Sequence, residues 1–349
     1  MNIIVVDVAA EKTGALSVLT DFYNYVKENP MNGVEWFFFT SVVKLDEADG
    51  IHVIQEKRIK KSWIHRIVWE YSDFRKIVNS CDAHVILSLQ NKSMPVKNVP
   101  QVVYFHNALH LLKRGTFNIF NKFERYYCIY CSLVTPITMR SLNQSDLIIT
   151  QTNTIKSGLE KRIKNKKIIC IPPAISTTPV VDRCRVKGFV YPCGPLVYKK
   201  HEIIIESLKK GKQYKGEIIF TFRESDNVYA ERLASMSKGL SNVKFIGFQE
   251  RGNLLDLFCD HGLIFASDIE SFPVPFVEAM AYGAPIIARN MPYAREILAD
   301  YSNVEFFNDS DDLSEILQKS ENARRGEPYS INIESPWAKV VSSVIEISK

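Results

Sequence analysis

Short apolar runs separated by polar loops and amphipathic stretches recur along the whole chain and predict strands alternating with helices. The runs stand at residues 3–8, 34–41, 52–55, 83–89, 101–105, 145–152 and 166–173, and again at 189–192, 217–222, 242–248, 262–266, 285–289 and 304–308. Runs this short and this apolar are typical of strands that are buried on both faces of a parallel sheet. Strands that alternate with helices predict an α/β fold.

The length and the linker pattern predict two domains. A chain of 349 residues exceeds the usual size of one domain. Residues 172–188 (PPAISTTPVVDRCRVKG) are rich in Pro, Ser and Thr, as expected of a linker. We therefore expect a first domain at 1–178 and a second at 179–334, followed by a final amphipathic helix at 335–349. A long aromatic helix is also expected at 117–142.

Composition indicates a globular protein without a membrane-spanning helix. Hydrophobic residues make up 46% of the chain and charged residues 24%, which is ordinary for a packed core. No apolar run approaches the roughly 18 residues that a spanning helix needs. The start, MNIIVVDVAA, lacks a basic region and predicts a first strand, not a signal peptide. Seven cysteines without an export signal predict reduced thiols and a cytoplasmic location.

The positive charge is concentrated in the first half of the chain. Residues 1–173 carry 23 Lys and Arg against 15 Asp and Glu, a net charge of +8, and the remainder carries −3, which together give the overall +5. The segment 57–78 combines basic residues with Trp63 and Trp69. This pattern suits an anionic membrane surface or a lipid phosphate. No nucleic-acid recognition module accompanies it, and a solvated helix face with core aromatics is the structural alternative.

The stretch 265–297 carries the clearest chemical signal. It predicts a buried strand, a polar loop, a helix and a second strand, with Pro275 suited to the first helical turn and Gly283 to the residue after the helix. Open α/β sheets bind ligands at the carboxyl ends of such strands, and a helix start attracts anions. Glu270 and Glu278 flank the loop, and carboxylates suit sugar hydroxyls. Phosphate and polyol on one ligand indicate a nucleotide sugar.

Glu270 and Glu278, followed by EAMAYGAP and Glu296, resemble the E-x7-E signature of family 4 glycosyltransferases. These are retaining enzymes of the GT-B fold. The resemblance implies two Rossmann-like parallel-sheet domains facing a central cleft, with helix 335–349 packing back on the first domain. It also implies that no cofactor and no metal is required, because the nucleotide sugar is a substrate.

The resemblance assigns roles in the second domain. Lys199 matches a lysine that grips the donor diphosphate, but Pro195 stands where the family usually has an arginine. Arg223, just after a strand, is the candidate to compensate for this loss. Glu270 is expected to hold sugar hydroxyls and Glu278 the ribose. Further donor contacts are expected from Phe248 near the base and from the loop residues Ser271, Phe272 and Val274, because Pro273 and Pro275 lack N–H groups.

The first domain is expected to complete the site. His106, just past a strand, matches a family histidine that reaches the donor sugar. Gly14 matches the family's glycine-rich first loop, although a tight strand-to-helix turn would equally explain it. Arg125 or Arg140 would face an acceptor phosphate.

Three patterns that could bind metal have simpler explanations. His106 and His110 lack a third ligand, and the single C-x-x-C pair Cys128 and Cys131 suits helix packing. The D-x-D at 309–311 precedes a predicted helix and reads as a cap with first-turn acids.

The sequence therefore predicts a retaining, metal-independent glycosyltransferase that moves a sugar from a nucleoside diphosphate to an acceptor hydroxyl. The acceptor is expected to be a saccharide or lipid-linked glycan of a lipopolysaccharide, O-antigen or capsule, made at the inner face of the membrane. The alternatives are a sugar-nucleotide epimerase of the same architecture and a non-catalytic nucleotide-sugar-binding partner. Nucleic acid is not an expected partner.

Overall fold

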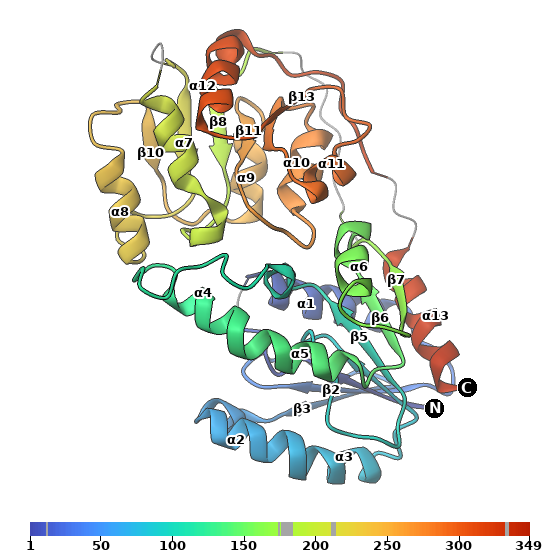
Figure 1. Cartoon of the computed structure of the whole chain (residues 1–349). Coiled ribbons are helices and arrows are strands. Elements are labelled where there is room, and N and C mark those ends of the chain that lie inside the picture. The colour runs from blue at the N-terminus through green and yellow to red at the C-terminus, as the bar shows by residue number, and fades with distance from the viewer. Residues whose placement is uncertain (12, 174, 176–183, 211–213, 332–334) are drawn as a thin grey trace. The chain divides into compact units, whose positions relative to one another are not determined.

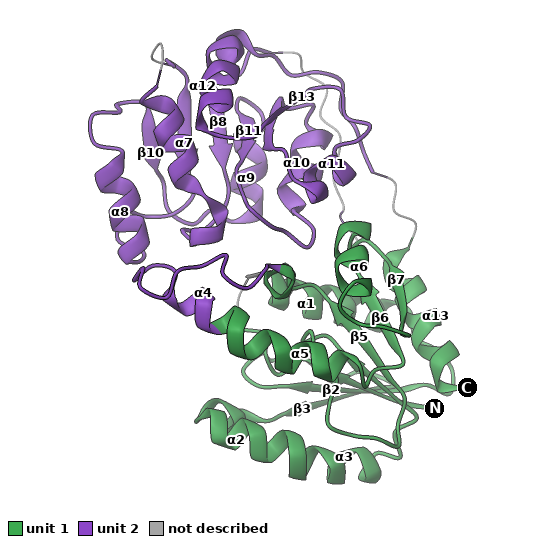
Figure 2. Ribbon diagram, viewed as in Figure 1, with its two compact units in different colours: residues 1–111, 130–174, 334–349 green, residues 112–129, 175–333 purple. Residues whose placement is uncertain are grey.

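The chain folds into two compact units, coloured separately in Figure 2. The computed structural model describes all residues except 12, 174, 176–183, 211–213 and 332–334. Unit 1 comprises residues 1–111, 130–174 and 334–349, and unit 2 comprises residues 112–129 and 175–333. Most of the predicted linker lies outside the described residues, so the expected boundary at 178 stays a prediction.

Unit 1 contains a parallel sheet with the strand order β3-β2-β1-β4-β5-β6-β7 (Figure 1). Its strands are β1 (Asn2–Val6), β2 (Glu35–Thr40), β3 (Ile51–Gln55), β4 (Val85–Ser88), β5 (Gln101–Phe105), β6 (Leu147–Thr150) and β7 (Lys167–Cys170). The strand order reverses direction between β1 and β4, where Ile3 is in register with Val85. The predicted short apolar runs of the first half are confirmed as these strands.

Helices cover both faces of this sheet because successive strand residues point to opposite sides. Ile3 and Val5 pack in one core with α1 (Thr13–Glu28) and α13 (Pro336–Ser348), whereas Ile4 and Val6 pack in another that includes α3 (Phe74–Ser80). The remaining helical segments of unit 1 are η1 (Lys57–Lys60), α2 (Trp63–Val68), η2 (Trp69–Asp73), η3 (Ala108–Leu111), η4 (Tyr130–Val134), α5 (Thr135–Leu142) and α6 (Asn153–Glu160).

Unit 2 contains a second parallel sheet, with the order β10-β9-β8-β11-β12-β13. Its strands are β8 (Gly188–Tyr191), β9 (Glu217–Phe220), β10 (Val243–Phe245), β11 (Gly262–Phe265), β12 (Ile286–Arg289) and β13 (Val304–Phe307). Its helical segments are α4 (Arg125–Ile129), η5 (Val197–Lys199), α7 (His201–Leu208), α8 (Val228–Met236), α9 (Arg251–Leu257), α10 (Val274–Ala281), α11 (Pro292–Ile297), α12 (Ser310–Lys319) and η6 (Ser320–Asn322). The prediction of two Rossmann-like parallel sheets is confirmed.

The helix predicted at 117–142 begins later than expected, at Arg125. The side-chain oxygens of Asn118 and Asn121 accept from the N–H groups of Phe120 and Phe123, at 2.9 and 3.1 Å. Such local side-chain bonds favour turns and compete with helix formation. The aromatic pattern alone could not reveal this competition.

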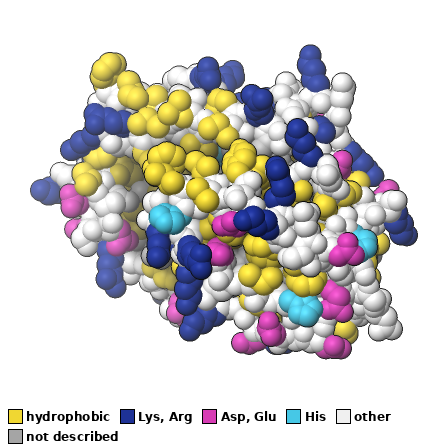
Figure 3. Space-filling view, turned by 90° about the horizontal axis from the view of Figure 1, so that it is seen from below, with side chains coloured by type: hydrophobic (Ala, Val, Ile, Leu, Met, Phe, Trp, Pro, Cys, Tyr) yellow, Lys and Arg dark blue, Asp and Glu magenta, His cyan; other side chains and the backbone are white. Residues whose placement is uncertain are grey.

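Exposed hydrophobic side chains are gathered on the face of the molecule shown in Figure 3, where Lys and Arg stand between them. Among the described residues, no helix has the length and apolar character needed to cross a bilayer.

Candidate functional site

The candidate site of unit 2 lies where two loops leave the carboxyl ends of β8 and β11. These strands are neighbours, with Val190 in register with Leu263, and the strand order of the sheet reverses between them. Loops on the two sides of such a reversal diverge and leave room for a ligand. The first loop carries Lys199 and the second carries Glu270, so the sheet brings together two residues that are 71 positions apart.

Lys199 and Glu270 form an ion pair in which Nζ donates to Oε1. Their side chains are 13% and 15% exposed. Burial alone would lower the pKa of the Lys199 ammonium group, but the negative charge of Glu270 and its hydrogen bond outweigh burial and raise the pKa above its ordinary value. Burial raises the pKa of the Cys193 thiol to about 12, so this thiol is neutral and Glu270 is the effective anion. Lys199 is therefore a fixed cation at neutral pH.

Backbone contacts fasten the two loops to each other. The hydroxyl of Tyr191 donates to the carbonyl of Lys199 at 2.7 Å. The N–H of Asp268 donates to the carbonyl of Tyr198 at 2.8 Å, and the hydroxyl of Tyr293 donates to the carbonyl of Ser267 at 2.6 Å. These bonds hold the main chain of the two loops near Lys199 and Glu270.

Lys200 has a different environment from Lys199. Its backbone is left-handed, with φ 54°, which turns the chain into α7. Its Nζ lies 3.6 Å from Oδ2 of Asp268 and 3.9 Å from Oε1 of Glu202. Asp268 also pairs with Arg289. Lys200 thus belongs to a charge cluster that braces the loop, which leaves Lys199 as the cation beside Glu270.

The loop 271–275 leads into α10 without a side-chain cap. The residue before the helix is Pro273, whose side chain makes no capping hydrogen bond to the first helical N–H groups. The N–H of Phe276 donates to the carbonyl of Pro273 at 3.0 Å and is already engaged within the helix start. Ser271 and Phe272 are half-buried, and Val274 is 37% exposed. The helix start thus offers a positive dipole end beside a partly exposed residue, Val274.

Glu278 lies one turn into α10 and is almost fully buried. Its side chain is 3% exposed, and its Oε1 accepts from Nε of Arg251 at 2.8 Å. Burial raises the pKa of Glu278, and Arg251 acts in the opposite direction. Arg251 begins α9, and its side chain is 55% exposed. We did not anticipate this contact, because nothing in the sequence links positions 251 and 278.

Arg223 and Phe248 are brought together at the neighbouring strand ends of β9 and β10. The Cγ and Nε atoms of Arg223 lie 3.2 Å from the point where a Cβ on Gly247 would stand, so the side chain runs along this glycine. Gly247 has φ 79°, a conformation that favours glycine. Phe248 is 79% exposed. Arg223 makes no ion pair with any residue that the structure describes, which leaves its charge available.

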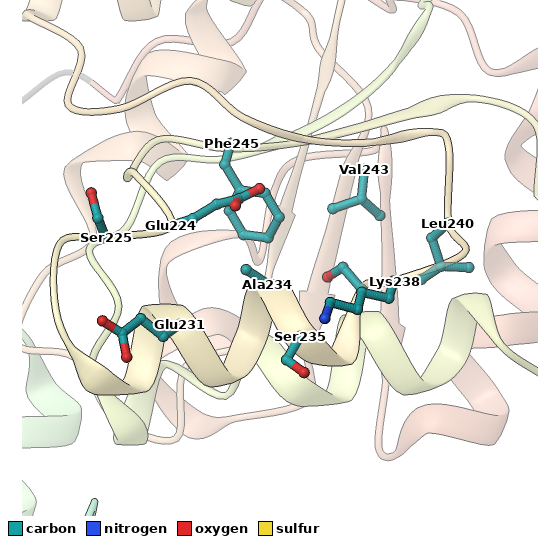
Figure 4. A pocket seen from close by; sticks show the side chains of 10 residues that line it. Glu224, Ser225, Glu231, Ala234, Ser235, Lys238, Leu240, Val243 and Phe245 are labelled. Atoms are coloured by element: carbon teal, nitrogen blue, oxygen red, sulfur yellow. The ribbon is translucent and has the colours of Figure 1, made fainter.

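A surface pocket of about 550 Å³ opens beside these residues, between α8 and β10 (Figure 4). Glu224 and Glu231 line it together with Lys238 and Phe245. Lys199 and Glu270 are not among its lining residues. Its carboxylates would repel a diphosphate, so we place the candidate site at the Lys199–Glu270 pair and not in this pocket.

His106 follows β5 in unit 1 and is held by the loop after β4. Its N–H donates to Oδ1 of Asn91 at 2.6 Å, and its Nε2 lies 2.7 Å from the carbonyl oxygen of Leu89. A carbonyl can only accept, so Nε2 carries the proton and Nδ1 is an acceptor. Burial lowers the pKa of His106, which keeps the ring neutral. A neutral, oriented histidine suits contact with a hydroxyl.

Gly14 lies in the first turn of α1 and its φ is not positive, so a left-handed backbone conformation does not explain the glycine. No heavy atom lies within 4 Å of the point where a Cβ would stand, and the space around it is open.

The proposed metal patterns do not assemble. His110 is buried, with Nδ1 3.1 Å from Oγ1 of Thr135 and Nε2 3.0 Å from the hydroxyl of Tyr130. Asp309 caps α12 by accepting from the N–H groups of Asp311 and Asp312, as predicted. Over the described part of the chain, no cluster of three His, Cys, Asp or Glu could hold a metal ion, and none of the seven cysteines, all of which are described, is in a disulfide.

Unit 1 holds a buried charge cluster that sequence reasoning missed. Glu70 is 5% exposed and accepts from Nε of Arg66 at 2.9 Å and from Nζ of Lys92 at 2.6 Å. Asp7, directly after β1, is 1% exposed, and its Oδ2 has no partner in the described structure. Burial raises the pKa of Asp7 to about 7. Both carboxylates lie near the strand reversal of unit 1. The apolar runs at 3–8 and 83–89 predict strands there, but they do not predict buried charged groups.

Comparison with known families supports the resemblance expected from the sequence. Residues 193–329 match the family described as Glycosyl transferases group 1. This segment contains Lys199, Glu270 and Glu278, and the resemblance is confirmed at the level of this family. The narrower assignment to retaining family 4 stays a prediction. Comparison with curated proteins finds no match.

Solved structures share the fold along nearly the whole chain. Sucrose-phosphate synthase from Thermosynechococcus elongatus aligns with a TM-score of 0.70 and 13% identity, covering 99% of this chain and 96% of that one. The lipopolysaccharide outer core galactosyltransferase WaaB aligns with 0.63 and 18%, covering 99% of each chain. Anabaena HepE in complex with UDP and glucose aligns with 0.62 and 16%, covering 99% and 96%. These identities show the fold alone, and the predicted GT-B fold is confirmed.

Proposed function

Because the second unit of this chain matches the group 1 glycosyltransferases, we propose that the protein transfers a sugar from a nucleoside diphosphate to an acceptor hydroxyl, with retained configuration. The observation that carries this proposal is the Lys199–Glu270 ion pair at the strand reversal of unit 2. A cation for phosphate and a carboxylate for sugar hydroxyls stand side by side, near an uncapped helix start. A nucleotide sugar is a ligand that needs both.

The difficult step is departure of the nucleoside diphosphate from a sugar centre that becomes positively charged. Lys199 would stabilise the developing charge on the phosphate, and the start of α10 would add its dipole. On donor binding, Nζ of Lys199 turns from Glu270 toward phosphate, and the Glu270 carboxylate is released to the sugar hydroxyls. Because the backbone already fixes both residues, little reorganisation accompanies this exchange.

Other residues would orient the donor. Glu278 would accept from ribose hydroxyls, since its only described protein partner is Arg251 at Oε1. Phe248 and the half-buried Ser271 and Phe272 would contact the base and phosphates. His106 would present its Nδ1 acceptor to the sugar when the domains close, and Gly14, in the first turn of α1, would allow the donor to approach the backbone. A donor phosphate oxygen would take the acceptor proton, and no metal would be needed.

The acceptor side of the proposal concerns membranes. We propose a cytoplasmic enzyme that binds the inner face of the membrane and extends a lipid-linked glycan such as a lipopolysaccharide, O-antigen or capsule. The net charge of +8 on residues 1–173 supports an anionic partner. Arg125 and Arg140 are candidates for contact with an acceptor phosphate.

Donor binding and transfer can be tested separately. A panel of nucleotide sugars is added to the wild type and to Glu278→Gln, and the melting temperature is measured. We expect one donor to stabilise the wild type and to stabilise the variant less. With that donor and membrane-extracted acceptors, release of nucleoside diphosphate and the anomeric configuration of the product are then followed, with and without a chelator.

Each competing function predicts a distinct result. Incorporation of solvent deuterium into the donor sugar without an acceptor would indicate an epimerase. A donor that binds and remains intact with every acceptor extract would indicate a binding partner without catalysis. If no nucleotide sugar stabilises the wild type, the proposed function is wrong.

A further inference from the structure

An apolar stripe runs along the outer side of the helical segment formed by α2 and η2. Trp63, Ile67 and Tyr71 are 73%, 45% and 63% exposed, and Ile64 and Val68 between them are 55% and 52% exposed. Residues four apart lie on one side of a helix, so these five form one continuous row. No residue of α2 is buried. An amphipathic helix normally turns such a row toward the core, and here it faces outward.

The inner side of the same segment is firmly anchored, so the stripe cannot rotate inward. Trp69 is 3% exposed and packs on Phe74, with ring centroids 5.2 Å apart. Trp69 therefore fits the structural alternative of a core aromatic, whereas Trp63 remains exposed. Glu70 binds Arg66 and Lys92 within the buried charge cluster. Turning the stripe inward would break these ion pairs and expose Trp69.

A second exposed apolar row lies on the helical run through η4 and α5. Leu133, Val134 and Ile137 are 63%, 39% and 68% exposed. The loop after β4 contacts both helical segments: Nη2 of Arg66 donates to Gln90 at 3.2 Å, and Oγ of Ser93 donates to the carbonyl of Ser141 at 2.5 Å. The two rows therefore flank one loop, consistent with the gathering of hydrophobic side chains in Figure 3.

Positive charge borders the stripe at its start. Lys57, Arg58 and Lys61 are exposed, and none of them forms an ion pair with a described residue. Lys60 differs from them because it pairs with Glu11. The surface thus combines a row of apolar side chains, including a tryptophan, with three available cations. This combination is the signature of a helix that lies in the headgroup region of an anionic bilayer.

We propose that α2 and η2, with Lys57, Arg58 and Lys61, form a membrane-docking surface whose apolar stripe inserts into the interface of an anionic bilayer. The occupant is a lipid surface and not a second copy of the chain. In a twofold dimer this patch would face itself and bring the three cations of each copy together, which is unfavourable. This inference rests on the proposed function, in which the enzyme binds a membrane, and it identifies the surface that would do so. Its test requires neither a sugar donor nor sugar transfer.

Intrinsic fluorescence provides a direct readout. Trp63 is 73% exposed, whereas Trp36, Trp69 and Trp337 are 3%, 3% and 5% exposed. The full-length protein is mixed with phosphatidylcholine vesicles that contain phosphatidylglycerol and brominated lipid. We expect a blue shift and quenching of the Trp63 emission, both absent in Trp63→Phe, which retains an apolar ring. Pure phosphatidylcholine vesicles should produce a much weaker effect.

Flotation of the same vesicles measures the binding. Ile64→Ser/Ile67→Ser should lower the partition coefficient at least tenfold, whereas Met31→Ser, which alters a 41% exposed residue before β2, should not. Lys57→Gln/Arg58→Gln/Lys61→Gln should also lower it at least tenfold, and the equally charged control Lys209→Gln/Lys215→Gln/Lys238→Gln in unit 2 should not. All altered side chains are exposed, so the melting temperatures should stay close to that of the wild type.

Two results would overturn the proposal. One is that the wild type does not bind vesicles, or that Ile64→Ser/Ile67→Ser and Lys57→Gln/Arg58→Gln/Lys61→Gln both bind them as well as the wild type does. The other is a concentration-dependent dimer that Ile64→Ser/Ile67→Ser abolishes, which would assign the stripe to a second copy. Thermal stabilisation by nucleotide sugars is measured on the same variants. Because the docking surface lies in unit 1 and the donor residues Lys199, Glu270 and Glu278 lie in unit 2, loss of vesicle binding with intact donor binding separates this inference from the proposed function.

Discussion

The Nε atom of Arg251 lies 2.8 Å from Oε1 of Glu278 and holds a carboxylate whose side chain is 3% exposed. Without this contact, the buried charge would have no described partner. The bond orients the Glu278 carboxylate through its Oε1 atom. Arg251 is thus a positioning residue for the expected ribose contact.

We predict that Arg251→Gln weakens donor binding about tenfold by allowing Glu278 to take up a proton or turn away. The donor KM should rise more than kcat falls, because the ribose lies away from the reacting bond. The free energy of unfolding should fall by only about 1 kcal/mol, since solvent screens the half-exposed guanidinium. Arg251→Lys should recover part of the affinity. Asn253→Ala, an exposed change on the same helix, is the control, and equal donor KM values in both variants would exclude the positioning role.

Lys199 and Lys200 are adjacent and provide a matched pair of variants. Lys199→Gln removes the cation beside Glu270, and we predict that kcat/KM falls about 10²- to 10³-fold, as for the loss of one preorganised charge at a leaving group. Lys200→Gln removes a brace on Asp268 and should change kcat/KM less than about threefold while lowering the melting temperature slightly. Steady-state kinetics with the identified donor checks both. Equal losses of kcat/KM in the two variants would show that Lys199 has no specific role in binding the donor phosphate.

Asp7 predicts a pH dependence of stability. Burial raises the pKa of the Asp7 carboxyl group in the folded protein from its ordinary value of 3.8 to about 7. A raised pKa means that the folded state binds the proton more tightly, so its stabilising effect is present at low pH and is lost as pH rises through 7. Between pH 6 and 8 this one group should reduce the free energy of unfolding by about 1.4 kcal/mol.

Asp7→Asn should remove that part of the slope, because the amide does not titrate. Urea unfolding of both proteins at pH 6, 7 and 8 measures the difference, and other titrating groups cancel in the comparison. If the two slopes are the same, Asp7 is ionised over this range and the orphaned Oδ2 must have found a partner in solution.

Arg223 should compensate for the missing arginine at Pro195. Its side chain runs along Gly247 beside the exposed Phe248 and carries no described ion pair. We predict that Arg223→Gln weakens binding of the nucleoside diphosphate about tenfold or more, as expected for one charge-assisted hydrogen bond. Binding of the nucleoside without phosphate should not change. Glu224→Gln, next to it and lining the pocket of Figure 4, is the control in the same calorimetric titration.

The sequence predicted the fold well because strand position depends on local apolar runs, and the parallel order follows from their alternation with helices. Lys199 and Glu270 lie together because both follow strands that end at the same edge of one sheet, but the sequence did not predict that the two side chains would form an ion pair. It could not reveal Arg251 as the partner of Glu278, because that contact depends on how α9 packs beside α10. The side of the helix that faces the core likewise decides whether Trp63 or Trp69 is buried. Amino-acid composition does not determine this side.

Two prolines lie in the loop that leads into α10, and they restrict the conformations that this loop can adopt. Pro273 and Pro275 fix the backbone φ angle at two of the five positions between Ser271 and Pro275. A loop restricted in this way samples few shapes before its ligand arrives. The loop should therefore already be close to its bound conformation before the ligand arrives. Ligand binding at this helix start should cost little conformational entropy of the chain.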